Sequence, residues 1–266
     1  MDFSNEELKA KYNPEGSVTR RIQDRMLEIL QIIDSICQKH NITYWLSGGS
    51  MLGAVRHKGY IPWDDDLDIE LLRDDFFKLL TILEKELPEN LSLQWHTTDK
   101  NYFFCFAKVR DKNSRIKDLT GYDRIWKERG VWVDIFPLAK IPRTIHNLSV
   151  KTFGHTYKVL RTASDPMKAA KKVRFWAALN RYLIFPFLRF LSFFSFTKYY
   201  DFDLGIPYYQ KSTISDYLPV KYVDFESVKA PIANDANNYL TIRYGDYMKL
   251  PDNPGAQCHN EKVEIW

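Results

Sequence analysis

Cysteine is scarce in this sequence, which has three among 266 residues, at positions 37, 105 and 258, and no Cys-x-x-Cys pair. An odd number of widely spaced cysteines excludes a disulfide framework and a zinc ribbon. A basic start followed by an apolar run is also missing at the N-terminus, where residues 1–16 are polar and acidic, so we expect no secretory signal peptide. Both features predict a reducing, cytoplasmic location for the catalytic part.

A strong excess of one charge is absent as well. The 38 Lys and Arg residues nearly balance the 34 Asp and Glu residues, which leaves a formal charge of +4. This balance excludes a nucleic-acid coat, so we predict no nucleic-acid partner. Hydrophobic residues make up 45% of the chain and aromatic residues 15%. The chain is therefore globular, with surplus aromatic surface that can serve ligands or membranes.

Helix and strand patterns fill residues 1–143. Apolar residues at helical spacing predict a helix over 18–39, and a second helix starts near Asp74 and ends before Pro88. Short apolar, β-branched or aromatic runs predict strands at 42–46, 67–71, 91–95, 103–109 and 131–136. We therefore predict an α/β (α+β) core, 1–143, with a small mixed sheet flanked by helices.

Two further units follow this core. The strand pattern disappears over 144–205, where the composition becomes basic and then Phe-rich, and we predict a helical appendage there. Residues 206–266 are predicted to be a C-terminal segment that packs on the core. This segment has a strand-like run at 222–225 and a helix-like run at 234–244 that ends at Gly245.

The appendage has the composition of a membrane-surface helix. Residues 158–181 hold seven basic residues and one acidic residue, and residues 183–197 hold six phenylalanines and one charged residue. The Phe-rich run is shorter than the ~20 apolar residues of a membrane-spanning helix. A basic segment beside an apolar one is typical of a helix in the interface of an anionic membrane. A buried core helix with a solvated basic neighbour is the alternative.

The turn Ser47-Gly48-Gly49-Ser50 follows the strand predicted at 42–46. Gly48 and Gly49 lack a Cβ, so that backbone N–H groups can approach an anion. The apolar residues after Ser50 are typical of a helix start, where free amides point at a phosphate. We predict that Gly48, Gly49 and Ser50 bind a substrate phosphate; a simple turn is the alternative.

Four carboxylates crowd into five residues at Asp64, Asp65, Asp66 and Asp68. They repel one another unless a cation neutralises them. In a strand, Asp64, Asp66 and Asp68 project to one face, while Asp65 points away. Carboxylate oxygens are the ligands that Mg²⁺ and Mn²⁺ prefer. We therefore predict a metal site; a solvated acidic turn is the alternative.

A further carboxylate, Asp134, lies inside the apolar run Val131-Trp-Val-Asp-Ile-Phe-Pro137. An unpaired charge in an apolar strand is costly, so we expect Asp134 to have a partner. If its strand lies beside the strand of Asp66 and Asp68, three carboxylates converge opposite the glycine turn. Metal-assisted phosphoryl transfer requires this arrangement, with a carboxylate that orients or deprotonates the attacking hydroxyl.

Three segments combine these motifs: Gly48-Gly-Ser-Met-Leu-Gly-Ala-Val-Arg-His-Lys-Gly-Tyr-Ile-Pro-Trp-Asp-Asp-Asp-Leu-Asp68, Val131-Trp-Val-Asp-Ile-Phe-Pro-Leu138 and Tyr244-Gly-Asp-Tyr-Met-Lys-Leu-Pro251. Together they resemble the LicD family of the nucleotidyltransferase-fold superfamily, whose animal relatives include fukutin and fukutin-related protein. Bacterial members transfer phosphocholine from CDP-choline to sugars of lipopolysaccharide or teichoic acid. The animal relatives transfer ribitol phosphate from CDP-ribitol.

The resemblance implies roles for the matching residues. Asp66, Asp68 and Asp134 would be catalytic and, together with Asp64, would bind Mg²⁺ or Mn²⁺. The glycine turn would contact the phosphates of a CDP-choline donor. Reaction at the phosphorus that bears the head group would release CMP.

Three basic residues are further candidates for binding the donor phosphates. Arg56 follows the glycine turn, and a salt bridge to the Asp cluster is its alternative role. Lys108 and Arg110 end the strand predicted at 103–109, where a solvated surface position is the alternative. The resemblance also leads us to expect an arginine soon after the Tyr244-Gly-Asp motif, but residues 253–260 contain none.

We predict a metal-dependent phosphotransferase that moves phosphocholine, or a similar phospho-head group, from a CDP-activated donor to a sugar hydroxyl. The acceptor would be a glycan or lipid-linked glycan such as lipopolysaccharide or teichoic acid, with peripheral contact to the cytosolic face of the membrane. A glycosyltransferase whose Asp-x-Asp motif holds a nucleotide-sugar is one alternative, but it leaves the glycine turn unexplained. The other is a non-catalytic membrane-surface binding module, against which the presence of Asp66, Asp68 and Asp134 argues.

Overall fold

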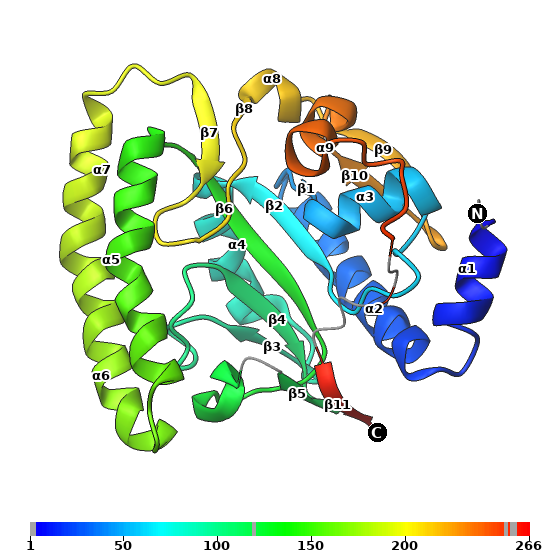
Figure 1. Cartoon of the computed structure of the whole chain (residues 1–266), viewed down its shortest axis with the longest axis horizontal. Helices are drawn as coiled ribbons and strands as arrows, with labels where there is room; N and C mark the ends of the chain where they lie inside the picture. Colours follow the sequence, from blue (N-terminus) through cyan, green and yellow to red (C-terminus); the bar gives the residue numbers. More distant parts are fainter. Residues whose placement is uncertain (1–3, 119–120, 253–254, 256–259) are drawn as a thin grey trace.

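The centre of the fold is a mixed sheet built around one long strand, β6 (Trp132–Lys140). The structure is a computed structural model that describes residues 4–118, 121–252, 255 and 260–266. The segment 253–260, in which the resemblance led us to expect an arginine, therefore lies largely outside the described residues. The strands follow the order β1–β2–β6–β4–β3, while β7 pairs with β6 and β8 with β7 (Figure 1). Their bounds are β1 (Trp45–Leu46), β2 (Asp68–Leu72), β3 (Leu91–Gln94), β4 (Ala107–Asp111), β7 (Tyr199–Phe202) and β8 (Ser212–Thr213).

The pairing of β6 sets the register of the site. β2 runs parallel to β6 and places Asp68 beside Asp134. On the other side, β4 pairs antiparallel with the first part of β6 and places Lys108 beside Asp134. β7 pairs antiparallel with the end of β6, where Phe202 lies beside Leu138. One strand therefore brings the early part of the chain together with the segment after residue 198.

Two helices pack against this sheet, α2 (Val18–Lys39) and α4 (Arg73–Glu86). α2 begins after Ser17, whose side chain accepts a hydrogen bond from the Arg20 N–H. Its buried residues recur at helical spacing, which gives it one apolar face. That face supplies much of the hydrophobic core together with the sheet.

The two faces of the sheet have different chemistry. Ile69 and Ile135 are fully buried among other apolar side chains. Because side chains alternate along a strand, Asp68 and Asp134 project from the opposite face. The sheet thus has one face for packing and one that presents carboxylates.

Three helices stand together at one end of the molecule, on the left in Figure 1: α5 (Arg143–Arg161), α6 (Pro166–Leu179) and α7 (Phe185–Phe193). A π-helical turn, η2 (Asn180–Ile184), joins α6 to α7 without a break, and α5 packs beside α6. After α7 the chain enters β7 and returns to the central sheet. Within the described part of the chain, no helix has the combined length and apolarity needed to cross a bilayer.

The remaining elements lie mostly at the other end, on the right in Figure 1: α1 (Asn5–Tyr12), α3 (Gly48–His57), α8 (Ile214–Tyr217), β9 (Lys221–Phe225), β10 (Val228–Ile232) and α9 (Ala236–Tyr244). α3 contacts both α9 and β9. A separate two-stranded sheet pairs β5 (Ser114–Asp118) with β11 (Asn260–Ile265), and a short 3₁₀ turn, η1 (Tyr122–Ile125), follows β5. The C-terminal part of the chain therefore contacts the early elements that carry the glycine turn.

The predicted α+β fold is confirmed, and two strand predictions need correction. The helices expected at 18–39, from Asp74 to Pro88 and at 234–244 correspond to α2, α4 and α9. The strand expected at 42–46 pairs only at Trp45–Leu46, because the Ile42 N–H still donates to the Cys37 carbonyl at the end of α2. The strand expected at 103–109 begins only at Ala107. The residues before it are not paired in the sheet, and the rings of Phe103 and Phe104 pack against Tyr157 and Trp126 instead.

Phe76 and Phe77 are neighbours on α4 with opposite environments, 0% and 40% exposed. We predict that Phe76→Ala lowers the free energy of unfolding by about 3–5 kcal/mol, because it leaves a cavity in the core. Phe77→Ala is the matched control and should cost about 1 kcal/mol or less. Urea unfolding followed by circular dichroism measures both, and equal losses would contradict this packing.

Candidate functional site

A cleft of about 540 Å³ opens on the face of the sheet that presents the carboxylates. Its walls come from the first turn of α3, the loop between α3 and β2, strands β2, β6 and β7, and the segment from α9 to residue 252. The charged residues of the lining are four acidic residues around the sheet, two acidic residues in the C-terminal segment and three basic residues: Asp64, Asp66, Asp68, Asp134, Asp246, Asp252, Arg56, Arg243 and Lys249. Acidic and basic groups therefore face the same space.

The predicted carboxylates meet in this cleft. Asp64, Asp66 and Asp68 line it, whereas Asp65 is buried outside it, as the alternation of a strand predicts. Asp134 joins them because the parallel pairing of β2 with β6 places it beside Asp68, and its N–H donates to the Leu67 carbonyl at 2.8 Å. The structure thus brings the sequence-predicted group together from two strands.

Asp134 has the partner that its buried position requires. Lys108 Nζ lies 2.5 Å and 2.7 Å from its two carboxylate oxygens, and the indole N–H of Trp132 donates to it at 2.9 Å. Burial lowers the pKa of Lys108, although the neighbouring Asp134 opposes that shift. Lys108 was predicted to bind phosphate, but here its ammonium group is engaged by Asp134, and it is not among the residues that line the cleft.

Asp64 and Asp68 are buried carboxyl groups whose charged forms are disfavoured. Burial, followed by the neighbouring Asp66, raises the pKa of both carboxyls well above the usual range. Asp134 raises the pKa of Asp68 further, while Arg243 and Lys108 lower it. A cation bound in the cleft would oppose these shifts and stabilise the charged carboxylates.

These carboxylates fit a divalent cation that binds together with a phosphate substrate. Among the described residues, no group of three His, Cys, Asp or Glu side chains forms a ready metal site. Mg²⁺, however, is usually held by one or two carboxylates together with substrate phosphates and water. The all-oxygen chemistry of Asp66 and Asp68 agrees with that mode of binding.

The glycine turn forms the first turn of α3. Gly48 has a φ of +49°, which favours glycine, and its N–H donates to the Tyr239 hydroxyl at 3.0 Å. Gly49 lines the cleft, where a Cβ would lie 2.9 Å from a carboxylate oxygen of Asp64. The Ser50 hydroxyl accepts a hydrogen bond from the Asp68 N–H at 2.9 Å. The turn therefore presents the positive end of a helix close to the acidic group.

A buried carboxylate that we did not predict, Glu70, anchors these elements. It lies two residues after Asp68 on β2 and is fully buried. The hydroxyls of Ser47 and Tyr239 donate to it, the latter at 2.8 Å, and so does the Trp45 indole N–H at 3.1 Å. Burial raises the pKa of Glu70, although Arg243 and these hydrogen bonds oppose the rise. Glu70 thus joins β1, β2, α3 and α9.

Arg243 is the second functional candidate that sequence reasoning missed. It lies near the end of α9, lines the cleft, and its buried Nη1 has no hydrogen-bond partner. Its Nη2 would lie 3.4 Å from a Cβ at Gly48. The family resemblance led us to expect an arginine after the Tyr244-Gly-Asp motif, and the structure instead brings one from just before it. Arg243 supplies a positive group beside the glycine turn.

The two remaining basic candidates have different positions. Arg56 lines the cleft, where its guanidinium donates to the carbonyls of Tyr247 at 2.9 Å and Lys249 at 3.4 Å. It therefore holds the C-terminal wall against α3. Arg110 is not brought to the cleft, because its guanidinium donates to Gln94 at 2.9 Å and to the Gly130 carbonyl at 2.7 Å.

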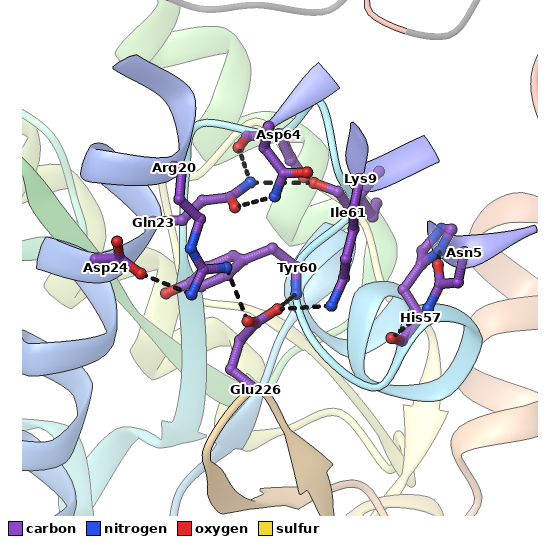
Figure 2. A network of polar contacts seen from close by, with 11 residues as sticks. Asn5, Lys9, Arg20, Gln23, Asp24, His57, Tyr60, Ile61, Asp64 and Glu226 are labelled. Atoms are coloured by element: carbon purple, nitrogen blue, oxygen red, sulfur yellow. Dashed lines mark hydrogen bonds and ion pairs between the residues drawn. The ribbon is translucent and has the colours of Figure 1, made fainter. Parts of the chain in front are cut away.

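Figure 2 shows the polar contacts that hold the loop between α3 and β2. Glu226, between β9 and β10, accepts hydrogen bonds from Arg20 Nη1 at 2.8 Å and from the Tyr60 N–H at 3.1 Å. Gln23 of α2 donates to the Asp64 carbonyl at 2.9 Å. Because α2 and the β9–β10 hairpin both bind this loop, they determine where Asp64 enters the cleft.

Comparison with protein-family models identifies one matching domain. The model of the LicD/FKTN/FKRP nucleotidyltransferase domain matches residues 41–179, which include the glycine turn and the strands with Asp68 and Asp134. The chain belongs to this family. The matched residues make up more than half of the chain and include the first two of the three resembling segments.

Individual relatives cover different shares of the chain. The lipopolysaccharide cholinephosphotransferase LicD of Haemophilus influenzae is 29% identical over 261 residues, which span 88% of this chain and 92% of the relative. An uncharacterised protein of Rickettsia prowazekii is 40% identical over 120 residues, 44% of this chain and 43% of that protein. Human ribitol 5-phosphate transferase FKRP is 40% identical over 48 residues, 18% of this chain and 10% of that protein. The homology supports a phosphotransferase.

The Glu226 contacts of this LicD-family chain allow a stability test with an internal control. Glu226 is 8% exposed and pairs with Arg20, so we predict that Glu226→Ala lowers the free energy of unfolding by about 3 kcal/mol, because Arg20 loses its buried partner. Asp224→Ala removes an exposed pair with Lys229 on the same hairpin and should leave the unfolding midpoint unchanged. Chemical denaturation measures both, and a stable Glu226→Ala protein would contradict the role of this network.

Proposed function

We propose that the chain is a metal-dependent phosphotransferase that moves phosphocholine, or a similar phospho-head group, from a CDP-activated donor to a sugar hydroxyl of a cell-surface glycan. CMP is the second product. The similarity to a lipopolysaccharide cholinephosphotransferase over 88% of the chain supports this function, as does the cleft chemistry. The FKRP similarity, although short, involves another transferase of a phospho-head group.

The observation that best supports the proposal is that acidic and basic groups line the same cleft. Asp66 and Asp68 lie on one side, and the first turn of α3 with Arg243 lies next to them. A diphosphate needs a cation for its oxygens and hydrogen-bond donors at the same time. The buried Nη1 of Arg243, which has no hydrogen-bond partner, is suited to donate to such an oxygen.

In the proposed reaction, the acceptor hydroxyl oxygen forms a bond to the phosphorus that bears the head group. The bond between that phosphorus and the oxygen shared with CMP breaks, and CMP leaves with the electron pair. A carboxylate of the Asp64–Asp68 group takes the hydroxyl proton. Lys108 and Trp132 hold the Asp134 side chain in place, and this side chain lies beside Asp68.

Asp66 and Asp68 are the residues that would hold the metal ion, with Asp64 and Asp134 next to them. Mg²⁺ or Mn²⁺ bound there would neutralise diphosphate oxygens and polarise the phosphorus toward attack. Arg243 and the α3 amides orient the same diphosphate from the other side. The protein therefore positions the donor mainly through charge.

The aromatic lining of the cleft suits a cationic head group. Trp63, Phe136, Phe202, Tyr208 and Tyr244 line it. Faces of aromatic rings attract quaternary ammonium groups. CDP-choline is therefore the donor we propose first, ahead of CDP-ethanolamine and CDP-ribitol.

The direct test measures CMP release from CDP-choline with Mg²⁺ or Mn²⁺ and a lipopolysaccharide or teichoic acid acceptor. We predict that Asp66→Asn and Asp68→Asn each lower the rate by roughly 100-fold or more, because each removes a ligand for the cation. Asp74→Asn, at an exposed carboxylate on α4, is the control and should retain the full rate. Release of UDP from a UDP-sugar, with none of CMP from CDP donors, would contradict the proposal.

Arg243 gives a second test of the same reaction. We predict that Arg243→Gln lowers kcat/KM for CDP-choline by roughly 10-fold to 100-fold, since a charge-assisted hydrogen bond to the diphosphate is lost. Arg243→Lys should recover part of this loss, and the exposed Arg21→Gln should have no effect. Steady-state kinetics with varied CDP-choline measures the change. An unaltered kcat/KM in Arg243→Gln would remove Arg243 from the site.

A further inference from the structure

The continuous helix formed by α6, η2 and α7 has an apolar surface over its second half and the residues that follow. Six large side chains there are each at least 59% exposed: Leu183, Phe187, Phe190, Phe193, Phe194 and Phe196. A contiguous exposed apolar surface of this kind marks a contact with a protein or a membrane. The buried residues Phe185 and Leu188 of the same helix pack inward, so the exposed residues are not needed for the core.

The first half of the same helix is basic. Lys168, Lys171 and Lys172 are exposed. Residues 166–200 contain seven Lys and Arg residues and no Asp or Glu. Asp165 precedes the helix and lies 3.6 Å from Lys168. The surface therefore combines exposed phenylalanines with a local excess of positive charge.

An apolar groove of about 390 Å³ borders this helix. Tyr182 and Pro186 form one side of it, and Phe77 and Trp95 of the central part form another. Arg73 and Arg189 line the groove too and share the carboxylate of Asp203, at 3.0 Å and 2.6 Å. Arg181 also lines it. The exposed phenylalanines therefore lie beside a groove that is mainly apolar and carries basic side chains.

We propose that this surface, defined by exposed residues of 168–196, docks on an anionic lipid surface with the helix parallel to the membrane. A helix of 28 residues is roughly 40 Å long, so its lysines can contact head groups while its phenylalanines enter the interface. A second copy of the chain would cover the phenylalanines, but a symmetric contact between the same surfaces would offer the lysines no acidic partner, because residues 166–200 contain no Asp or Glu. The charge therefore favours anionic lipid. The inference does not depend on the proposed catalytic function.

Flotation with lipid vesicles tests the proposal without reference to activity. The full chain should float with vesicles of phosphatidylcholine and phosphatidylglycerol, and much less with phosphatidylcholine alone. A Lys168→Gln, Lys171→Gln, Lys172→Gln variant should have a partition coefficient about 100-fold lower, since each lysine near an anionic surface contributes roughly fivefold. Raising the salt concentration should also weaken vesicle binding of the unmodified chain, because salt screens the attraction between lysines and anionic head groups.

A second variant tests the apolar half. A Phe190→Ser, Phe194→Ser variant should have a partition coefficient lower by roughly tenfold per substitution, because each replaced ring no longer contributes the free energy of transfer from water to the membrane interface. Lys85→Gln, Lys100→Gln, Lys221→Gln is the charge control, and Tyr222→Ser with Ile242→Ser is the apolar control. Both controls alter exposed residues outside 168–196 and should bind vesicles like the unmodified chain.

Two outcomes would overturn the proposal. The first is binding to anionic vesicles that neither the lysine nor the phenylalanine variant changes. The second is absence of vesicle binding together with a dimer, seen by light scattering, that the phenylalanine variant dissociates. In that case the surface would be a contact between copies of the chain. Circular dichroism of every variant verifies that the helices are retained.

Discussion

Repulsion among the carboxylates at the start of β2 is the constraint to which much of the structure responds. Asp64, Asp66 and Asp68 are held at one end of the strand, and the parallel neighbour adds Asp134. Such a group is unfavourable unless nearby cations and rigid supports offset the repulsion. The structure provides one cation for Asp134 and a second beside the glycine turn, and it leaves the remaining charge facing the cleft. A ligand that brings positive charge, such as the proposed metal ion, would offset the remaining repulsion.

The supports of the cleft lie behind it rather than within it. Glu70 ties the strand of Asp68 to α3 and α9 through hydroxyl and indole donors, while Glu226 and Gln23 hold the loop that carries Asp64. Because such buried polar contacts are directional, they limit the positions that the carboxylates can adopt. This arrangement explains why a site of like charges can belong to a well-packed fold.

Much of the fold and part of the site could be predicted because they depend on local patterns. The helical spacing of apolar residues located α2, and the expected alternation of side chains separated Asp65 from its neighbours, although residues 64–67 precede β2. Lys108 was recognised as a candidate, but its pairing with Asp134 depends on the register between β4 and β6, which joins residues 26 positions apart. Arg243 comes from a helix far along the chain. The pairing of Lys108 and the position of Arg243 both depend on long-range packing, which no local pattern encodes.

The π-helical turn between α6 and α7 has a consequence for how this family can vary. A helix advances by about 100° per residue, so one additional residue in a regular α-helix would rotate everything after it about the helix axis. A π turn takes up the additional residue within one wide turn and so cancels that rotation. In this chain it keeps Phe185 and Leu188 directed inward, in continuation of the buried face of α6. Loss of a single residue between 180 and 184 would let the helix become regular with the same face inward, whereas the same loss elsewhere in α6 or α7 would rotate the exposed phenylalanines away from the basic half.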